Sequence, residues 1–166
     1  MKKGLLLAMV CFLVSGPLFS ENGQSQIPDI TITDIQGKKI SFSALKGKII
    51  ILNFWATWCP PCRTEIPDFI DAYAQHKNDG MVIIGISLDR GGPAVVKNFA
   101  ETNKINYPLA MMTREIYQSF DIGQYIPATF IIDRQGKIIQ KKVGPMTKEN
   151  LDQIFEVLSG DKENRL

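Results

Sequence analysis

The feature that most restricts how this chain can fold is an unbroken apolar run that leads into a pair of cysteines. The run IIILNFW, residues 49–55, has the length of one strand and no polar face, so we expect a strand covered on both sides. Cys59 and Cys62 follow, and residues 61–77 carry apolar side chains at helical spacing. The cysteine pair is therefore predicted at the turn between a buried strand and a helix.

The rest of the chain alternates strand and helix signals and ends with an antiparallel hairpin and a helix. A hydrophobic content of 45% with 22% charged residues suits a chain that buries a core, and no linker or internal repeat divides it. The pattern predicts one α/β domain, a mixed central sheet flanked by helices on both faces. We expect an edge hairpin at 30–42, strands at 81–89, 106–111, 126–133 and 137–144, and helices after 91–93, over 113–120 with Thr113 as its cap, and from Thr147.

Cys59 is predicted at the N-terminus of a helix, where unpaired N–H groups and the helix dipole stabilise a thiolate. It is therefore the better nucleophile of the pair. Pro60 and Pro61 have no N–H to donate, but they fix φ and hold the sulfurs close together. In dithiol exchange the Cys59 thiolate would attack a partner's disulfide, and Cys62 would then attack the Cys59 sulfur and release the reduced partner.

A structural bridge and a metal site are the other uses of such a pair. A bridge that encloses two residues restrains the unfolded chain little, which argues against a structural role. A closed zinc site needs four ligands, and the exported chain offers only Cys59, Cys62 and His76. We expect His76 to be a solvated helix residue. Copper, which favours soft thiolates, stays open as an alternative.

The first 20 residues have the order of a secretory signal, with Lys2 and Lys3 before an apolar run over 5–14 and a breaker segment up to Ser20. Cleavage near Ser20, an uncleaved membrane anchor and a lipidated Cys11 are the alternatives. Export places the cysteines where disulfides persist. Without residues 1–20 the chain has 17 basic and 17 acidic residues, so no net basic charge argues for nucleic acid as a partner.

Two segments carry a specific family resemblance. NFWATWCPPCRTEIP and YIPATFIID resemble the thioredoxin superfamily and, within it, the ResA/TlpA-type extracytoplasmic thiol-disulfide oxidoreductases that include cytochrome c maturation proteins. The resemblance implies a thioredoxin-like domain at 27–160 with an N-terminal hairpin and a central strand-helix insertion between residues 81 and 120. A polar lead at 21–26 precedes the domain, and a polar tail at 161–166 follows it.

The same resemblance implies the site residues. Cys59 is the attacking thiol, Cys62 the resolving thiol and Pro127 a cis-proline beside them. Trp58, Pro60, Pro61, Ile126 and Pro127 are expected to bind the partner, the Ile126 backbone by adding the partner peptide as one more strand.

Glu65 and Asn53 separate this sequence from cytoplasmic thioredoxins. Glu65 matches an acidic residue that this subgroup carries one turn after the cysteines, where it acts on proton transfer or on Cys59 ionisation. The alternative is a favourable charge near a helix start, and for Trp58 the alternative is a packed aromatic. Asn53 stands where thioredoxins have a buried aspartate, and it cannot take a proton. We expect Arg63 to be solvated.

The resulting expectation is an extracytoplasmic enzyme, without a cofactor, that reduces disulfides in exported proteins. Apocytochrome c is the client that the family implies, and a membrane thiol carrier is the electron donor. The alternatives are a broader reductant or isomerase, a copper or haem-delivery chaperone and a peroxiredoxin-like peroxidase. Peroxidase chemistry wants a threonine three residues before a lone cysteine, whereas Thr57 lies two before Cys59.

Overall fold

The computed structural model describes residues 26–160. The predicted signal or anchor in residues 1–20, the lipidation alternative at Cys11, nearly all of the polar lead and the tail at 161–166 lie outside the described residues. Within 26–160, no helix combines the length and the apolar character that crossing a membrane requires.

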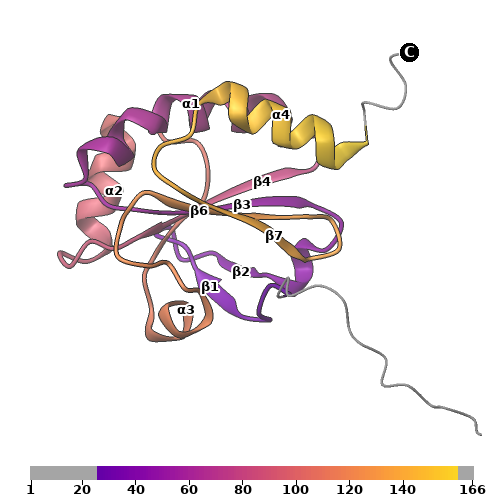
Figure 1. The fold of residues 1–166 in the computed structure, drawn as a ribbon. Helices are drawn as coiled ribbons and strands as arrows, with labels where there is room; N and C mark the ends of the chain where they lie inside the picture. Colours follow the sequence, from indigo (N-terminus) through magenta and orange to yellow (C-terminus); the bar gives the residue numbers. More distant parts are fainter. Residues whose placement is uncertain (1–25, 161–166) are drawn as a thin grey trace, which may run out of the picture.

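A five-stranded mixed sheet forms the centre of the fold, in the order β5-β4-β3-β6-β7 (Figure 1). The strands β3, β4 and β5 run parallel, whereas β6 is antiparallel to β3 and β7 is antiparallel to β6. This arrangement confirms the predicted fold class. The strands are β3 (Ile49–Trp55), β4 (Met81–Ser87), β5 (Leu109–Met111), β6 (Ala128–Ile132) and β7 (Ile138–Val143).

Helices cover both faces of the sheet, as predicted. Figure 1 shows α1, α2 and α4 over one face, and α3 with the hairpin β1-β2 on the other. The hairpin is a two-stranded sheet of its own, so the prediction of an edge hairpin in the central sheet was wrong. The Ile35 N–H, just after the first hairpin strand, donates to the Leu109 carbonyl of β5 at 2.8 Å and connects the two sheets. The helices are α1 (Pro60–His76), α2 (Pro93–Thr102), α3 (Arg114–Ser119), α4 (Lys148–Ser159) and the 3-10 turn Ser43–Leu45, and the hairpin strands are β1 (Thr31–Thr33) and β2 (Lys39–Ser41).

All seven residues of β3 are buried, because the sheet has a core on each side. Successive side chains of a strand point to opposite faces, so the apolar run feeds both cores in turn. Ile49, Ile51 and Trp55 pack under α1, α2 and α4, and Ile50, Leu52 and Phe54 face α3 and the hairpin.

Local sequence signals set the helix starts. Pro60 and Pro61 occupy the first turn of α1, one residue earlier than predicted. Thr113 caps α3, and Thr147 caps α4 in a capping box with Asn150. The expected caps at Thr113 and Thr147 are therefore correct.

Four strands are shorter than predicted, β7 by one residue at each end. β4 ends at Ser87 because the chain turns there, with the Asp89 carboxylate accepting the Ser87 hydroxyl at 2.8 Å. β6 begins at Ala128 because Pro127 has no N–H to give to the strand ladder. β5 covers only the end of its predicted range.

Candidate active site

Cys59 caps the N-terminus of α1 immediately after the loop that leaves β3. Its sulfur accepts the backbone N–H of Cys62 at 3.3 Å. Pro60 and Pro61 fill the positions whose amides would otherwise point the same way. The predicted strand-to-helix turn is confirmed, and across residues 26–160 one helix amide, the Cys62 N–H, reaches the sulfur.

Cys59 and Cys62 form a disulfide, with the sulfurs 2.08 Å and the Cα atoms 5.3 Å apart. The Cys59 residue is 4% exposed, whereas Cys62 is fully buried. Both residues are buried, and the small surface that remains exposed belongs to Cys59. The geometry favours Cys59 as the sulfur that meets a partner.

The segment before β6 lies against this sulfur. The Ile126–Pro127 peptide bond is cis, and the Ile126 carbonyl oxygen lies 3.7 Å from the Cys59 sulfur. Pro127 is buried and Ile126 is half-buried. Trp58 is 64% exposed, so the packed-aromatic alternative is wrong, and Tyr125, which sequence reasoning missed, is 72% exposed.

Glu65 lies on the face of α1 that packs against the sheet, and only 3% of the residue is exposed. Glu65 does not lie in the first turn of α1, and its burial does not suit the alternative of a favourable charge near the helix start. Its Oε1 accepts the Asn53 side-chain N–H at 2.8 Å, and its Oε2 accepts the Met146 backbone N–H at 3.0 Å. Burial raises the pKa of Glu65 to about 7, against the lowering effect of these two hydrogen bonds.

Asn53 and Thr129 hold Glu65 from the sheet side. They are directly opposite each other on β3 and β6, and the Asn53 amide donates to the Thr129 hydroxyl at 3.0 Å as well as to Glu65. Both amide hydrogens of Asn53 are thus used, which fixes the orientation of its side chain. Thr129 was missed by sequence reasoning because no local pattern distinguishes it from its apolar neighbours.

Asp89 fixes the loop between β3 and Cys59. Its carboxylate accepts the Thr57 backbone N–H at 3.0 Å and the Thr57 hydroxyl at 2.6 Å, in addition to the Ser87 hydroxyl. Asp89 follows β4, whose carboxyl end lies beside that of β3 because the two strands are parallel. This position was the signal that could have identified it.

His76 is buried, so the expectation of a solvated residue was wrong. Its Nε2 lies 2.8 Å from Asp152 Oδ1, and its ring stacks on Phe155 at a centroid distance of 4.3 Å. These contacts join the end of α1 to α4. Arg63 is exposed as expected, with its guanidinium 5.8 Å from the centre of the Phe99 ring.

The residues considered for zinc are not brought together. Cys59 and Cys62 bond to each other, and His76 pairs with Asp152 at the opposite end of the 17-residue helix α1. Among residues 26–160, no group of three or more His, Cys, Asp or Glu side chains has a spacing that could hold a metal ion.

Comparison with known proteins places these features in a family. The model of the AhpC/TSA family matches residues 24–141. A thiol-disulfide oxidoreductase ResA of Bacillus cereus is 36% identical, over 89% of this chain and 87% of the relative. ResA of Bacillus subtilis is 31% identical, over 95% of this chain and 91% of the relative.

Solved structures agree with the sequence matches. A thiol:disulfide interchange protein of the thioredoxin family from Chlorobium tepidum superposes with a TM-score of 0.79 and 34% identity, over 85% of this chain and all of that one. StoA from Bacillus subtilis superposes with a TM-score of 0.67 and 32% identity, over 78% of this chain and all of that one.

Proposed function

Because the chain belongs to the AhpC/TSA family and is a thiol-disulfide oxidoreductase similar to the ResA proteins, we propose that it acts outside the cytoplasm as a reductant of disulfides in exported proteins. In this proposal residues 1–20 export the chain and either leave it or tether it, and residues 27–160 form the redox domain. Apocytochrome c is the proposed client, and a membrane thiol carrier is the proposed electron donor.

The observation that carries the proposal is the unequal exposure of two sulfurs at a helix start. Cys59 keeps 4% of its surface exposed and accepts the Cys62 N–H, whereas Cys62 is fully buried. A hydrogen bond to the charged form and the positive end of the helix dipole both favour a thiolate on Cys59 once the disulfide is reduced. One sulfur is thus placed to attack, and the other to resolve.

The exchange consists of two balanced displacements. The Cys59 thiolate attacks one sulfur of the partner's disulfide, a mixed disulfide forms, and the other partner sulfur leaves as a thiolate. Cys62 then loses its proton and attacks the Cys59 sulfur, so the Cys59–Cys62 bond forms and the second partner sulfur leaves. Two electrons pass to the partner, and the protein ends as the disulfide seen in the structure.

Glu65 is the proposed acceptor of the Cys62 proton. It lies three residues after Cys62 on α1, which places the two side chains next to each other on one helix face. With a pKa of about 7, the carboxyl can take up and release a proton near neutral pH. Because Cys62 and Glu65 are both buried, bulk water is kept from accepting the Cys62 proton in place of Glu65.

The partner's main chain is proposed to dock on the segment before β6. The Ile126 backbone, 3.7 Å from the reacting sulfur, is available to an extended peptide beside Cys59. Trp58 supplies an exposed aromatic wall and Pro60 an exposed rigid apolar surface, while the buried Pro127 holds the Ile126 backbone in place beside Cys59. Pro61 completes the first turn of the helix behind them.

Peroxidase chemistry has less support. The Thr57 hydroxyl donates to Asp89 at 2.6 Å and so is engaged away from Cys59.

The chaperone alternative is tested by metal analysis. Copper bound in stoichiometric amount after purification under reducing conditions would favour a chaperone.

Trapping of mixed disulfides tests the proposal. A Cys62→Ser variant, exported in cells, lacks the resolving thiol, so we expect it to accumulate adducts through Cys59 that disappear on reduction. Mass spectrometry of the captured proteins identifies the clients, and cytochrome c polypeptides are expected among them.

The matched control is Cys59→Ser, which keeps the buried sulfur and removes the accessible one. It is expected to capture almost nothing. Equal capture by both variants would contradict the assigned order of the sulfurs, and no capture by Cys62→Ser would contradict disulfide exchange with exported proteins.

A further inference from the structure

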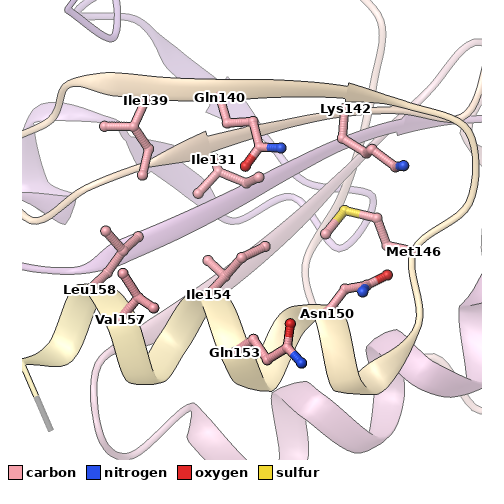
Figure 2. A pocket seen from close by; sticks show the side chains of 10 residues that line it. All are labelled: Ile131, Ile139, Gln140, Lys142, Met146, Asn150, Gln153, Ile154, Val157 and Leu158. Carbon is pink, nitrogen blue, oxygen red and sulfur yellow. The ribbon is translucent and has the colours of Figure 1, made fainter. Parts of the chain in front are cut away.

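A groove of about 400 Å³ runs between β7 and α4, on the face of the sheet that α1, α2 and α4 cover (Figure 2). It exists because α4 packs against α1 and β3 and leaves the outer strand β7 without a helix above it. A register shift between β6 and β7 falls at Ile131/Ile132, and beside it both Ile139 and Gln140 line the groove. A bulge at a sheet edge commonly redirects a side chain in this way.

The lining has the chemistry of a polypeptide site. Two amide side chains, Gln140 and Gln153, can donate to and accept from a peptide backbone, and Asn150, whose oxygen accepts the Thr147 N–H in the capping box, can still donate. Lys142 is the one charged residue of the lining, and no acidic side chain of the described chain takes part. The floor and walls are apolar: Ile131, Ile139, Met146, Ile154, Val157 and Leu158.

One end of the groove lies beside the loop that packs against the active site. The loop after β7 donates the Gly144 N–H to the Pro127 carbonyl at 2.9 Å, and the Met146 N–H of the same loop donates to Glu65. Figure 2 shows the Met146 and Lys142 side chains at this end of the groove, and Ile139 and Leu158 toward the other. A chain bound at Cys59 that continues past Pro127 therefore meets the groove next.

We propose that the groove binds an extended segment of the redox partner's own polypeptide, beside its disulfide, with an apolar side chain on the floor and a carboxylate at Lys142. This inference rests on the proposed function and adds the chemistry of the partner. The position of the groove beside the active-site loop, the backbone-compatible amides and the single positive charge favour a polypeptide with an acidic group.

The spacing follows from strand geometry. From Val143 beside the active site to Ile139 is four residues along β7, or about 13 Å at roughly 3.3 Å per residue. An extended partner covers the same distance with the same number of residues. The apolar side chain is therefore expected about four to six residues from the partner's cysteine.

The test compares disulfides that can and cannot reach the groove. The probe is a peptide of about ten residues with one cysteine as a mixed disulfide with glutathione. A leucine lies four to six residues from the cysteine, and an aspartate lies about one to three residues from it, opposite Lys142. A second peptide has serine in place of leucine, and glutathione disulfide is the small substrate. In each case the reduced full chain becomes the disulfide, the substrate becomes two thiols, and thiol release gives the second-order rate constant.

We expect the leucine peptide to react about tenfold faster than the serine peptide, the effect of burying roughly half a leucine side chain. Val157→Lys changes a groove-wall residue that is 59% exposed and lies on α4 away from the disulfide. It should remove that tenfold preference and leave the rate with glutathione disulfide unchanged.

Charge reversal provides an independent arm. Lys142→Glu should slow the aspartate peptide and speed a peptide with lysine in place of aspartate. The matched control, Lys97→Glu on the exposed face of α2, should change neither.

Equal rates for the leucine and serine peptides with the unmodified chain would overturn the groove inference while glutathione disulfide is still reduced. A chain that reduces none of the three disulfides would overturn the proposed function itself. If light scattering shows a dimer that Val157→Lys makes monomeric, with no change in peptide rates, the groove is an interface between two copies and the inference is wrong.

Discussion

Replacement of Glu65 by glutamine tests the buried carboxyl that lies behind the cysteines. In the oxidised protein the thiols do not titrate, so stability can be compared across pH without their contribution. The folded-state pKa of Glu65 is about 7, compared with an ordinary value of 4.5. The folded protein therefore binds a proton that the unfolded chain has already lost between these two values.

The sign and size of the effect follow from linkage. Since the folded pKa is raised, the stabilising contribution is complete below pH 4.5 and is lost as pH rises through about 7. A pKa difference of that size corresponds to about 3 kcal/mol of unfolding free energy. In Glu65→Gln this pH-dependent contribution is absent.

The substitution also has a cost that does not depend on pH. Both oxygens of Glu65 accept hydrogen bonds, from Asn53 and from Met146. A glutamine side chain presents one oxygen and one NH₂ group, so one of these buried donors faces another donor. We expect this mismatch to cost about 1 to 3 kcal/mol at every pH.

Urea unfolding of both oxidised proteins between pH 4.5 and pH 8.5, followed by tryptophan fluorescence, measures the difference. Glu65→Gln is expected to be clearly less stable than the unmodified protein at acidic pH and to equal or exceed it at pH 8.5. All other titrating groups are common to the two proteins and cancel. Two parallel curves of stability against pH would refute the reasoning.

Three further changes test other parts of the account. Gly85→Ala should lower the unfolding free energy by about 1 to 3 kcal/mol in urea titration, because its Cβ would lie 2.6 Å from a Leu109 methyl and 2.9 Å from Trp55 Nε1; an unchanged midpoint contradicts the packing described. Thr147→Ala should lower the unfolding free energy by about 1 kcal/mol through loss of the α4 cap, whereas Thr147→Ser should keep most of the stability that the cap provides. Thermal unfolding measures both. Burial alone would raise the pKa of Asp152, but hydrogen bonds from Lys148 and His76 outweigh it and lower the pKa. Asp152→Asn should therefore destabilise the protein at pH 7, and the loss of stability should shrink as the solution is acidified below the ordinary aspartate pKa. A loss of stability that does not change with pH would contradict this prediction.

The parts of the fold that follow from local chemistry were predictable. The β3 bounds match the apolar run residue for residue, and Thr113 and Thr147 cap the helices they were expected to cap. The cysteine pair lies at the expected turn because a buried strand must leave the core at the point where the apolar run ends.

One error on α1, the expectation of a solvated His76, came from residue type overruling periodicity. Glu65 and His76 share the buried helical stripe with Cys62, Phe69 and Ala72, so the spacing of the stripe already indicated that both are buried. Charged and imidazole side chains are usually exposed, and that tendency misled the prediction for His76. Their partners, Asn53 and Asp152, supply the polar contacts that permit burial.

Contacts between distant segments were beyond the sequence. Thr129 lies 76 residues from Asn53, and only the pairing of β3 with β6 brings them together. The groove beside β7 likewise depends on where α4 packs across the sheet, which no single element specifies.

The reduction potential of the Cys59–Cys62 pair tests the central claim most directly. The claim is a reversible two-electron exchange that donates electrons. Among the described residues one helix amide, the Cys62 N–H, reaches the Cys59 sulfur, because Pro60 and Pro61 have no N–H, so the thiolate is stabilised less than several amides would stabilise it. Equilibration in glutathione buffers with acid quenching is expected to show one two-electron transition nearer the thioredoxin value of about −270 mV than the DsbA value of about −120 mV. A potential near −120 mV, or a bond that never opens under reducing conditions, would contradict the account.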